Sequence, residues 1–247
     1  MRAGVYDSGV GGLTVAKSLI EHKLFDEIVY FGDTARVPYG TKESKTIIKY
    51  SLEALELLKS FDIDIMIVAC NTVSAYALEE LQKNASFKIF GVIEPGVLAA
   101  VNRLKEQNSS ILILGTKATI ASGQYEKLLR QNGYNNLISL NPSLFVPIVE
   151  EGLFEGEVLQ STMEHYFKNI KQEPDAVILG CTHFPLISKA LQNYFPKSVL
   201  IHSGDAIVEY LESKCNIKRS KNKTSLKLLA SDNVKILEST ANLWLKN

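Results

Sequence analysis

The sequence predicts an α/β fold of two pseudo-symmetric, doubly wound domains with mostly parallel sheets and an active site in the cleft between them. Short apolar, β-branched runs alternate along the chain with stretches that carry apolar residues at helical spacing. This alternation is typical of parallel sheets covered by helices on both faces. Four short motifs also recur in the same order at offsets of 108 to 111 residues. The length of 247 residues suffices for two units of about 110 residues each.

Each expected strand is a short run of Val, Ile, Leu, Tyr or Phe, which is the pattern of strands buried on both faces. In chain order, these strands cover residues 2–6, 27–31, 64–69, 88–93, 110–114, 136–140, 176–180, 198–202 and 226–230. Between the strands, apolar residues recur every three or four positions with charged residues among them, as in amphipathic helices. The expected helices cover residues 13–22, 45–60, 74–83, 96–106, 123–131, 156–170 and 186–195.

The recurring motifs place equivalent residues in the two halves. Cys70 lies in IVACNT and Cys181 lies in ILGCTH, 111 positions later, and each follows an apolar run and precedes a helix-like stretch. Further matching pairs are Ser8 and Thr116, Val37-Pro38 and Val146-Pro147, and Ile93 and Ile201. Four matches in one order indicate two related α/β units.

The segments GVIEPG and LIHSGD each follow an expected strand and carry turn residues. We therefore expect the chain to cross between the two halves near residues 93 and 206. The first domain is then discontinuous and comprises residues 1–92 and 207–247, whereas the second domain comprises residues 93–206.

Composition excludes several classes of partner. Lys plus Arg and Asp plus Glu number 27 each, so the formal charge is zero and nothing indicates a nucleic acid or an anionic membrane as partner. The basic segment 214–227 lacks interleaved aromatic residues and is expected to be a solvated loop. No apolar run approaches the roughly 20 residues that span a bilayer, and no signal peptide is evident, so a cytoplasmic protein is expected. An odd count of three cysteines favours reduced thiols over disulfides.

Cys70 and Cys181 are candidates for an acid and base pair, because α/β sheets bind ligands at the carboxyl ends of their strands. A thiol has an ordinary pKa of about 8.5, and the donors after both cysteines at expected helix starts favour the thiolate. Free cysteines are often simply small buried apolar residues. The recurrence of the same motif around Cys70 and Cys181 argues against that interpretation here. Cys215 has no equivalent motif in the other half of the chain, so we interpret it as a small apolar residue without a catalytic role.

Other chemistries fit the same motifs less well. Zinc could bind Cys70, Cys181 and His183, but no CxxC or HxxxH spacing is present, so no metal is expected. The glycine-rich loop of residues 7–12 matches neither GxGxxG nor the P-loop, so a nucleotide is not indicated. The glycines of this loop permit a tight turn in which Ser8 and backbone N–H groups could hold a carboxylate.

Two ionisable residues beside the motifs have alternative interpretations. Asp7 is either an ordinary turn residue or a charged partner for a thiol or a substrate ammonium group. His183 either caps the following helix or assists proton transfer at the neighbouring thiol. His22, His165 and His202 receive no catalytic role.

Seven motifs, spread in order over nearly the whole chain, resemble the glutamate racemase family of the aspartate/glutamate racemase superfamily. They are DSGVGG, GDTARVPYG, ACNT, GVIEPG, LGTKAT, LGCTHFPL and HSGD. The resemblance implies an isomerase that interconverts L- and D-glutamate without a cofactor and so supplies D-glutamate for peptidoglycan synthesis. It also implies a homodimer.

The resemblance further implies roles for individual residues. Cys70 would exchange the Cα proton of D-glutamate and Cys181 that of L-glutamate, with Asp7 assisting Cys70, and Glu150 and His183 assisting Cys181. The substrate-binding residues implied by the family, or by their polar side chains beside expected helix starts, are Asp7, Ser8, Tyr39, Gly40, Asn71, Thr72, Thr116, Thr119, Thr182 and His183.

Physical reasoning agrees with this assignment, since inverting a carbon centre needs a base on one face and an acid on the other. Two alternatives stay open on the sequence. The first is a racemase of the same superfamily that acts on aspartate or another acidic amino acid. The second is a non-catalytic α/β module that binds a small anion in its cleft.

Overall fold

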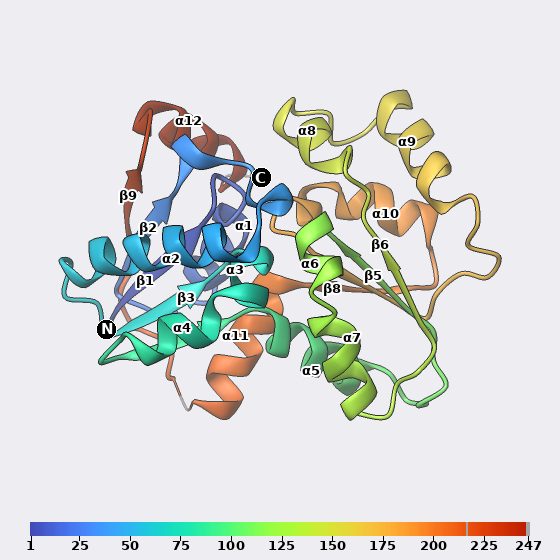
Figure 1. The fold of residues 1–247 in the computed structure, drawn as a ribbon, viewed down its shortest axis with the longest axis horizontal. Coiled ribbons are helices and arrows are strands. Elements are labelled where there is room, and N and C mark those ends of the chain that lie inside the picture. The colour runs from blue at the N-terminus through green and yellow to red at the C-terminus, as the bar shows by residue number, and fades with distance from the viewer. Residues whose placement is uncertain (216, 246–247) are drawn as a thin grey trace.

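The computed structural model describes residues 1–215 and 217–245, and within them the strands form two separate parallel sheets (Figure 1). The first sheet contains β1 (Arg2–Asp7), β2 (Glu27–Gly32), β3 (Ile65–Val68), β4 (Lys88–Gly91) and β9 (Ser225–Ala230). The second contains β5 (Ile111–Gly115), β6 (Leu137–Leu140), β7 (Ala176–Gly180) and β8 (Val199–His202). Each expected strand is found, and the α/β fold with parallel sheets is confirmed.

The two sheets repeat one order of strands. The first runs β4-β3-β1-β2-β9, and the second, read from its other edge, runs β8-β7-β5-β6. Strands β1 to β4 of the first sheet therefore have the same places in the strand order as β5 to β8 of the second, and β9 is an additional edge strand. The central pairs are β1 with β3 and β5 with β7, and all pairings are parallel. Because parallel strands end at the same edge of a sheet, Cys70 and Cys181 follow the carboxyl ends of equivalent strands.

Helices connect the strands and cover the sheets (Figure 1). The expected helices are found as α1 (Leu13–Glu21), α2 (Ser44–Lys59), α3 and α4 (Asn71–Tyr76 and Leu78–Lys83), α5 (Ile93–Arg103), α7 (Gln124–Gln131), α9 (Glu157–Phe167) and α10 (Ser188–Tyr194). The segment expected as a helix over 96–106 begins three residues earlier, because Ile93, Val97 and Ala100 form its buried face. The turn residues of GVIEPG are therefore part of α5.

Among the residues that the structure describes, the sequence patterns missed four α-helices, which are α6 (Lys117–Ala121), α8 (Phe145–Glu150), α11 (Ser203–Lys214) and α12 (Val234–Trp244). α8 is short and contains Pro147, and α11 begins in the turn-like segment SGD. The sequence predicts a turn at the start of α11, but the apolar residues Ala206, Ile207 and Leu211 carry its helical face against the core.

The central strands of each sheet are buried on both faces, as their continuous apolar runs predict. Ala3 and Val5 of β1 belong to a core cluster with α1 and α12, whereas Tyr6 belongs to a second cluster with α2. In β5, Leu112 belongs to the first of these clusters and Ile113 to a third cluster with α5 and α7. The first cluster thus contains residues from both sheets and joins the two halves through apolar contacts.

The lengths and compositions of the helices also bear on membrane insertion. Among the residues that the structure describes, none of the helices combines the length and the apolar composition that crossing a bilayer requires.

Candidate active site

One cavity of about 520 Å³ lies where the carboxyl ends of the two sheets meet. Cys70 and its neighbours line it from the first sheet, and Cys181 and its neighbours line it from the second. Both thiols are nearly covered by protein, with 6% and 5% of their surfaces exposed. Two thiols from equivalent strands of the two halves therefore face one shared space, as the repeated frames predict.

Cys70 lies at the amino end of α3, two residues after the last residue of β3. Its Sγ donates to the Ser8 hydroxyl at 3.5 Å, and the backbone N–H of Val73 also points to the sulfur. Burial and the nearby carboxylate of Asp7 outweigh these contacts and raise the pKa of Cys70 to about 12. The donors favour the thiolate, as the sequence indicates, because the contacts with Ser8 and Val73 lower the pKa, but burial outweighs them. Cys70 is a thiol at neutral pH.

Cys181 belongs to a chain of contacts that ends at the cavity mouth. Nδ1 of His183 lies 3.8 Å from the Cys181 sulfur, and its Nε2 lies 3.1 Å from Oε1 of Glu150. Although burial opposes a charge on the ring, the contacts with Cys181 and Glu150 raise the pKa of His183 to about 10. At neutral pH the ring is therefore an imidazolium that lies between Cys181 and Glu150.

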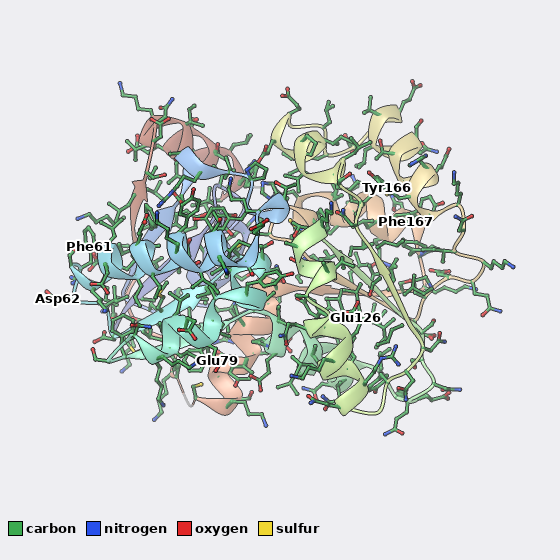
Figure 2. The ribbon with its side chains drawn as sticks, viewed as in Figure 1. Phe61, Asp62, Glu79, Glu126, Tyr166 and Phe167 are labelled. Atoms are coloured by element: carbon green, nitrogen blue, oxygen red, sulfur yellow. The ribbon has the colours of Figure 1, made fainter. Side chains whose placement is uncertain are left out.

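Aromatic packing places Glu150 beside His183. Phe145, at the start of α8, meets Phe184, which directly follows His183, with ring centroids 5.6 Å apart and nearly perpendicular planes. Tyr166 and Phe167 of α9, both labelled in Figure 2, pack on the same Phe145 ring at 5.7 and 6.0 Å. This cluster holds α8 against the segment after β7, so the acid at the end of α8 reaches the histidine.

Asp7 is the last residue of β1 and is completely buried. Its Oδ2 accepts from the backbone N–H of Gly9 at 2.9 Å, and its Oδ1 accepts from the Thr182 hydroxyl at 3.4 Å. Burial raises the pKa of Asp7, although the imidazolium of His183 works in the opposite direction. Asp7 does not line the cavity but contacts Gly9 and Thr182, which do.

Hydroxyl groups join the two halves at another part of the wall. Thr72 Oγ1 lies 2.9 Å from Thr116 Oγ1 and 3.2 Å from Thr119 Oγ1, and the last two are 2.9 Å apart. Thr116 also caps α6, because its oxygen accepts from the backbone N–H of Thr119. These contacts bring the polar motif of the first half against the equivalent motif of the second.

The wall formed by residues 37–41 is fixed from behind by a buried ionic network. The Tyr39 hydroxyl donates to the carboxylate of Asp33 and lies 3.0 Å from the hydroxyl of Tyr6. Asp33 is fully buried and pairs with Nε of Arg36 at 2.7 Å. Burial raises the pKa of Tyr39 far above its ordinary value, so its hydroxyl stays a donor. The sequence did not single out Asp33 or Arg36.

Most predicted site residues line the cavity itself, and these are Ser8, Tyr39, Gly40, Cys70, Asn71, Thr72, Thr116, Glu150, Cys181, Thr182 and His183. Asp7 and Thr119 do not line it but contact residues that do. Lining residues not predicted to bind substrate are Gly9, Val37, Pro38, Thr41, Gly115, Lys117, Asn141, Pro142, Ser143, Val146, Pro147 and Phe184. A signal for four of them existed, because Val37-Pro38 and Val146-Pro147 recur at equivalent positions of the repeat.

A metal site requires several ligating side chains at one place. In residues 1–215 and 217–245, no three His, Cys, Asp or Glu side chains are grouped so that they could hold a metal ion. The arrangement around Cys181 is instead a chain of pairwise contacts through His183.

Comparison with known proteins adds to this geometry. A family model described as Asp/Glu/Hydantoin racemase matches residues 16–211. A glutamate racemase of a Nitratiruptor species is 62% identical over 248 residues, which cover 100% of this chain and 97% of the relative.

Solved structures resemble the chain over the same extent. The crystal structure of glutamate racemase from Campylobacter jejuni subsp. jejuni matches with a TM-score of 0.98 and 55% identity, covering 100% of this chain and 98% of the other. Glutamate racemase from Francisella tularensis subsp. tularensis, solved in complex with D-glutamate, matches with a TM-score of 0.86 and 30% identity. That match covers 100% of this chain and 94% of the other.

Two parallel sheets whose carboxyl ends share a thiol-lined cavity define a two-domain α/β enzyme. The chain belongs to the Asp/Glu/Hydantoin racemase family and is an amino-acid racemase, an isomerase.

Proposed function

We propose that this racemase interconverts L- and D-glutamate by a cofactor-independent mechanism in which Cys70 and Cys181 act as two acid and base groups. The observation that carries the proposal is the presence of both buried thiols in one cavity, each contributed by a different half. The names of the relatives support glutamate as the substrate.

The proton inventory of the reaction explains the need for two sulfur atoms. One thiolate takes the Cα proton from one face of the amino acid, and the other thiol gives its own proton to the opposite face. The sulfurs end in exchanged protonation states, so the reverse reaction uses the same groups with exchanged roles. Following the family resemblance, Cys181 takes the proton of L-glutamate and Cys70 takes that of D-glutamate.

Neighbouring groups support each sulfur in this scheme. The imidazolium of His183 lies beside Cys181 and can compensate negative charge there. The raised pKa of Asp7 makes its carboxylate a better proton acceptor for the Cys70 side than an exposed carboxylate would be. We therefore assign Asp7 to the Cys70 side, and His183 with Glu150 to the Cys181 side.

The carbanion formed at Cα needs fixed hydrogen-bond donors, because the proposal includes no cofactor to delocalise its charge. Ser8, Tyr39, Gly40, Asn71, Thr72, Thr116, Thr119, Thr182 and His183 are assigned to binding of the amino acid or to support of the residues that bind it. Most of these groups are neutral donors in a largely buried space, where hydrogen bonds to a carboxylate are stronger than in water.

We also propose the biological setting that the family resemblance implies. The enzyme would act in the cytoplasm as a homodimer and supply D-glutamate for peptidoglycan synthesis. The discontinuous domain division, with residues 1–92 and 207–247 in one unit and 93–206 in the other, belongs to the same proposal. It is supported by the pairing of β9 with β2 in the first sheet.

The test is a circular-dichroism assay of purified protein with glutamate and, separately, with aspartate. We expect racemisation of glutamate without added cofactor, and losses of at least about 100-fold in Cys70→Ser and Cys181→Ser. Cys215→Ser is the matched control, since Cys215 does not line the cavity. Full activity of either cavity variant would overturn the two-thiol mechanism, and faster turnover of aspartate would overturn the choice of substrate.

A further inference from the structure

Tyr125 is a buried tyrosine of α7, the helix on which Figure 2 labels Glu126, and only 1% of its surface is exposed. Two glycines make room for its ring. A Cβ atom at Gly180 would lie 3.1 Å from ring carbon Cε2, and one at Gly96 would lie 3.3 Å from the phenol oxygen. The second half thus holds this ring in a slot that fixes the direction of its hydroxyl.

The Tyr125 hydroxyl reaches from the second half to the first. It donates to Oδ1 of Asn71 at 2.7 Å, and Asn71 opens α3 directly after Cys70. Asn71 lines the cavity, yet only 2% of its surface is exposed. A residue at the substrate cavity is therefore oriented by a residue that does not line the cavity.

This contact decides how the Asn71 amide is turned. The phenol is the donor in this contact, and burial, which raises the pKa of Tyr125, helps to keep its proton in place. The Asn71 side-chain oxygen Oδ1 therefore faces Tyr125, and both amide hydrogens are carried by the nitrogen Nδ2. One hydrogen points to Ser203 Oγ at 3.5 Å, which leaves the second amide hydrogen available to the cavity.

We propose that Tyr125 is a positioning residue that holds Asn71 as a hydrogen-bond donor toward a carboxylate of the substrate. The inference rests on the proposed function, because the amino-acid substrate proposed there supplies the carboxylate that this donor would bind. It also links substrate binding in the first half to α7 of the second half through a single hydroxyl group.

The variant that tests this inference is Tyr125→Phe, which keeps the ring in its slot and removes only the hydroxyl. We expect the KM for glutamate to rise about tenfold, as the loss of one oriented hydrogen bond predicts, while kcat changes less than about threefold. Tyr134→Phe is the matched control. Tyr134 is also buried in the second half, but its hydroxyl donates to the Leu104 carbonyl at 3.4 Å and it does not line the cavity.

A double-mutant cycle separates positioning from a general structural role. If Tyr125 acts through Asn71, Tyr125→Phe should change the KM less than about twofold in the Asn71→Ala background. An unchanged KM in Tyr125→Phe, or the full tenfold effect in the Asn71→Ala background, would overturn the inference alone. Failure of the unmodified protein to racemise glutamate would instead overturn the proposed function, and the inference with it.

Discussion

Nε2 of His183 lies 3.1 Å from Oε1 of Glu150, while Nδ1 of the same ring lies 3.8 Å from the Cys181 sulfur. The ring is nearly covered, whereas 48% of the Glu150 side chain is exposed. These contacts raise the pKa of His183 to about 10, against an ordinary value of about 6.5. The histidine therefore carries a charge in the folded protein over a pH range in which it is neutral in the unfolded chain.

This difference predicts how stability depends on pH. A raised pKa in the folded state stabilises the fold fully below about pH 6.5, and the contribution is lost as the pH rises to about 10. The free energy of unfolding of the unmodified protein should therefore exceed that of His183→Asn by more at pH 6 than at pH 10, by an amount on the order of 1 kcal/mol or more. Urea unfolding of both chains at the two pH values measures this difference, because the titration of groups remote from His183 cancels between them. An equal difference at both pH values would show that the histidine charge is not linked to folding.

Variants that keep a single cavity thiol should exchange hydrogen without inverting the substrate. With Cys70→Ala, the remaining Cys181 can remove a proton from L-glutamate and return a solvent deuteron to the same face. With Cys181→Ala, only D-glutamate should exchange. Nuclear magnetic resonance of each isomer in deuterium oxide would follow the Cα signal, and racemisation should fall at least about 100-fold in both variants.

The isomer dependence is the decisive part of that experiment. Cys215→Ala should exchange both isomers at the rate of the unmodified protein, since its thiol does not line the cavity. If Cys70→Ala exchanged D-glutamate instead of L-glutamate, the assignment of the two sulfurs would have to be reversed.

Gly11 allows the first half to approach the second near His183. A Cβ atom at this position would lie 2.3 Å from Thr182 Oγ1 and 2.7 Å from Cε1 of His183. Gly11→Ala should therefore displace the groups beside Cys181 and lower kcat by roughly 100-fold, the effect expected for a misplacement of about 1 Å. Steady-state kinetics measures this loss.

The control for added volume is Gly156→Ala. Gly156 has a φ of 99°, so alanine is strained there, but no atom lies within 4 Å of the added Cβ. We expect a loss of about 1 kcal/mol in stability with an unchanged kcat. If both glycine variants lost the same activity, a general effect on folding would account for the result at Gly11.

Arg36 compensates the fully buried carboxylate of Asp33 behind the Tyr39 wall. Removing one partner of a buried pair leaves an uncompensated charge, but 27% of the Arg36 side chain is exposed, so solvent reduces the penalty. We expect Arg36→Ala to lower stability by about 2 kcal/mol and to raise the KM, because Tyr39 and Gly40 lose their support. Thermal and urea unfolding, together with KM, measure the two effects.

The matched control is Arg219→Ala, since Arg219 also pairs with a carboxylate but on the surface, with 59% of its side chain exposed. Because water screens this exposed pair, a much smaller loss of stability is expected there. An Arg36→Ala variant as stable as Arg219→Ala would mean that the Asp33 carboxylate does not depend on its ion pair.

Sequence patterns predicted the strands and the positions of the two cysteines correctly, because both follow from residues that are neighbours in the chain. A parallel strand buried on both faces is a continuous apolar run, and the residue after it lies at the ligand-binding edge whatever the rest of the fold does. The repeated frame added that Cys70 and Cys181 occupy equivalent edges. Helices such as α8 and α11 were missed because tertiary packing of Phe145 and Ile207 outweighs their weak local signals.

Contacts between residues far apart in the chain could not be predicted in this way. The sign of the Cys70 pKa shift depends on burial and on Asp7, and neither effect is visible from the donors that follow the cysteine. The contact of Tyr125 with Asn71 spans 54 positions and depends on how the two halves dock. The helical periodicity of the sequence predicts that Tyr125 lies on the apolar face of a helix. It does not predict which residue its hydroxyl binds.

The position of β9 has a consequence for synthesis of the chain on the ribosome. β9 begins at Ser225 and pairs along its whole length with β2, which ends at Gly32. While the intervening residues are being translated, β2 therefore presents a free edge with unpaired backbone groups, which other nascent polypeptides could join. Protection of that edge by a chaperone, or rapid translation through the later codons, would reduce aggregation of the newly made protein.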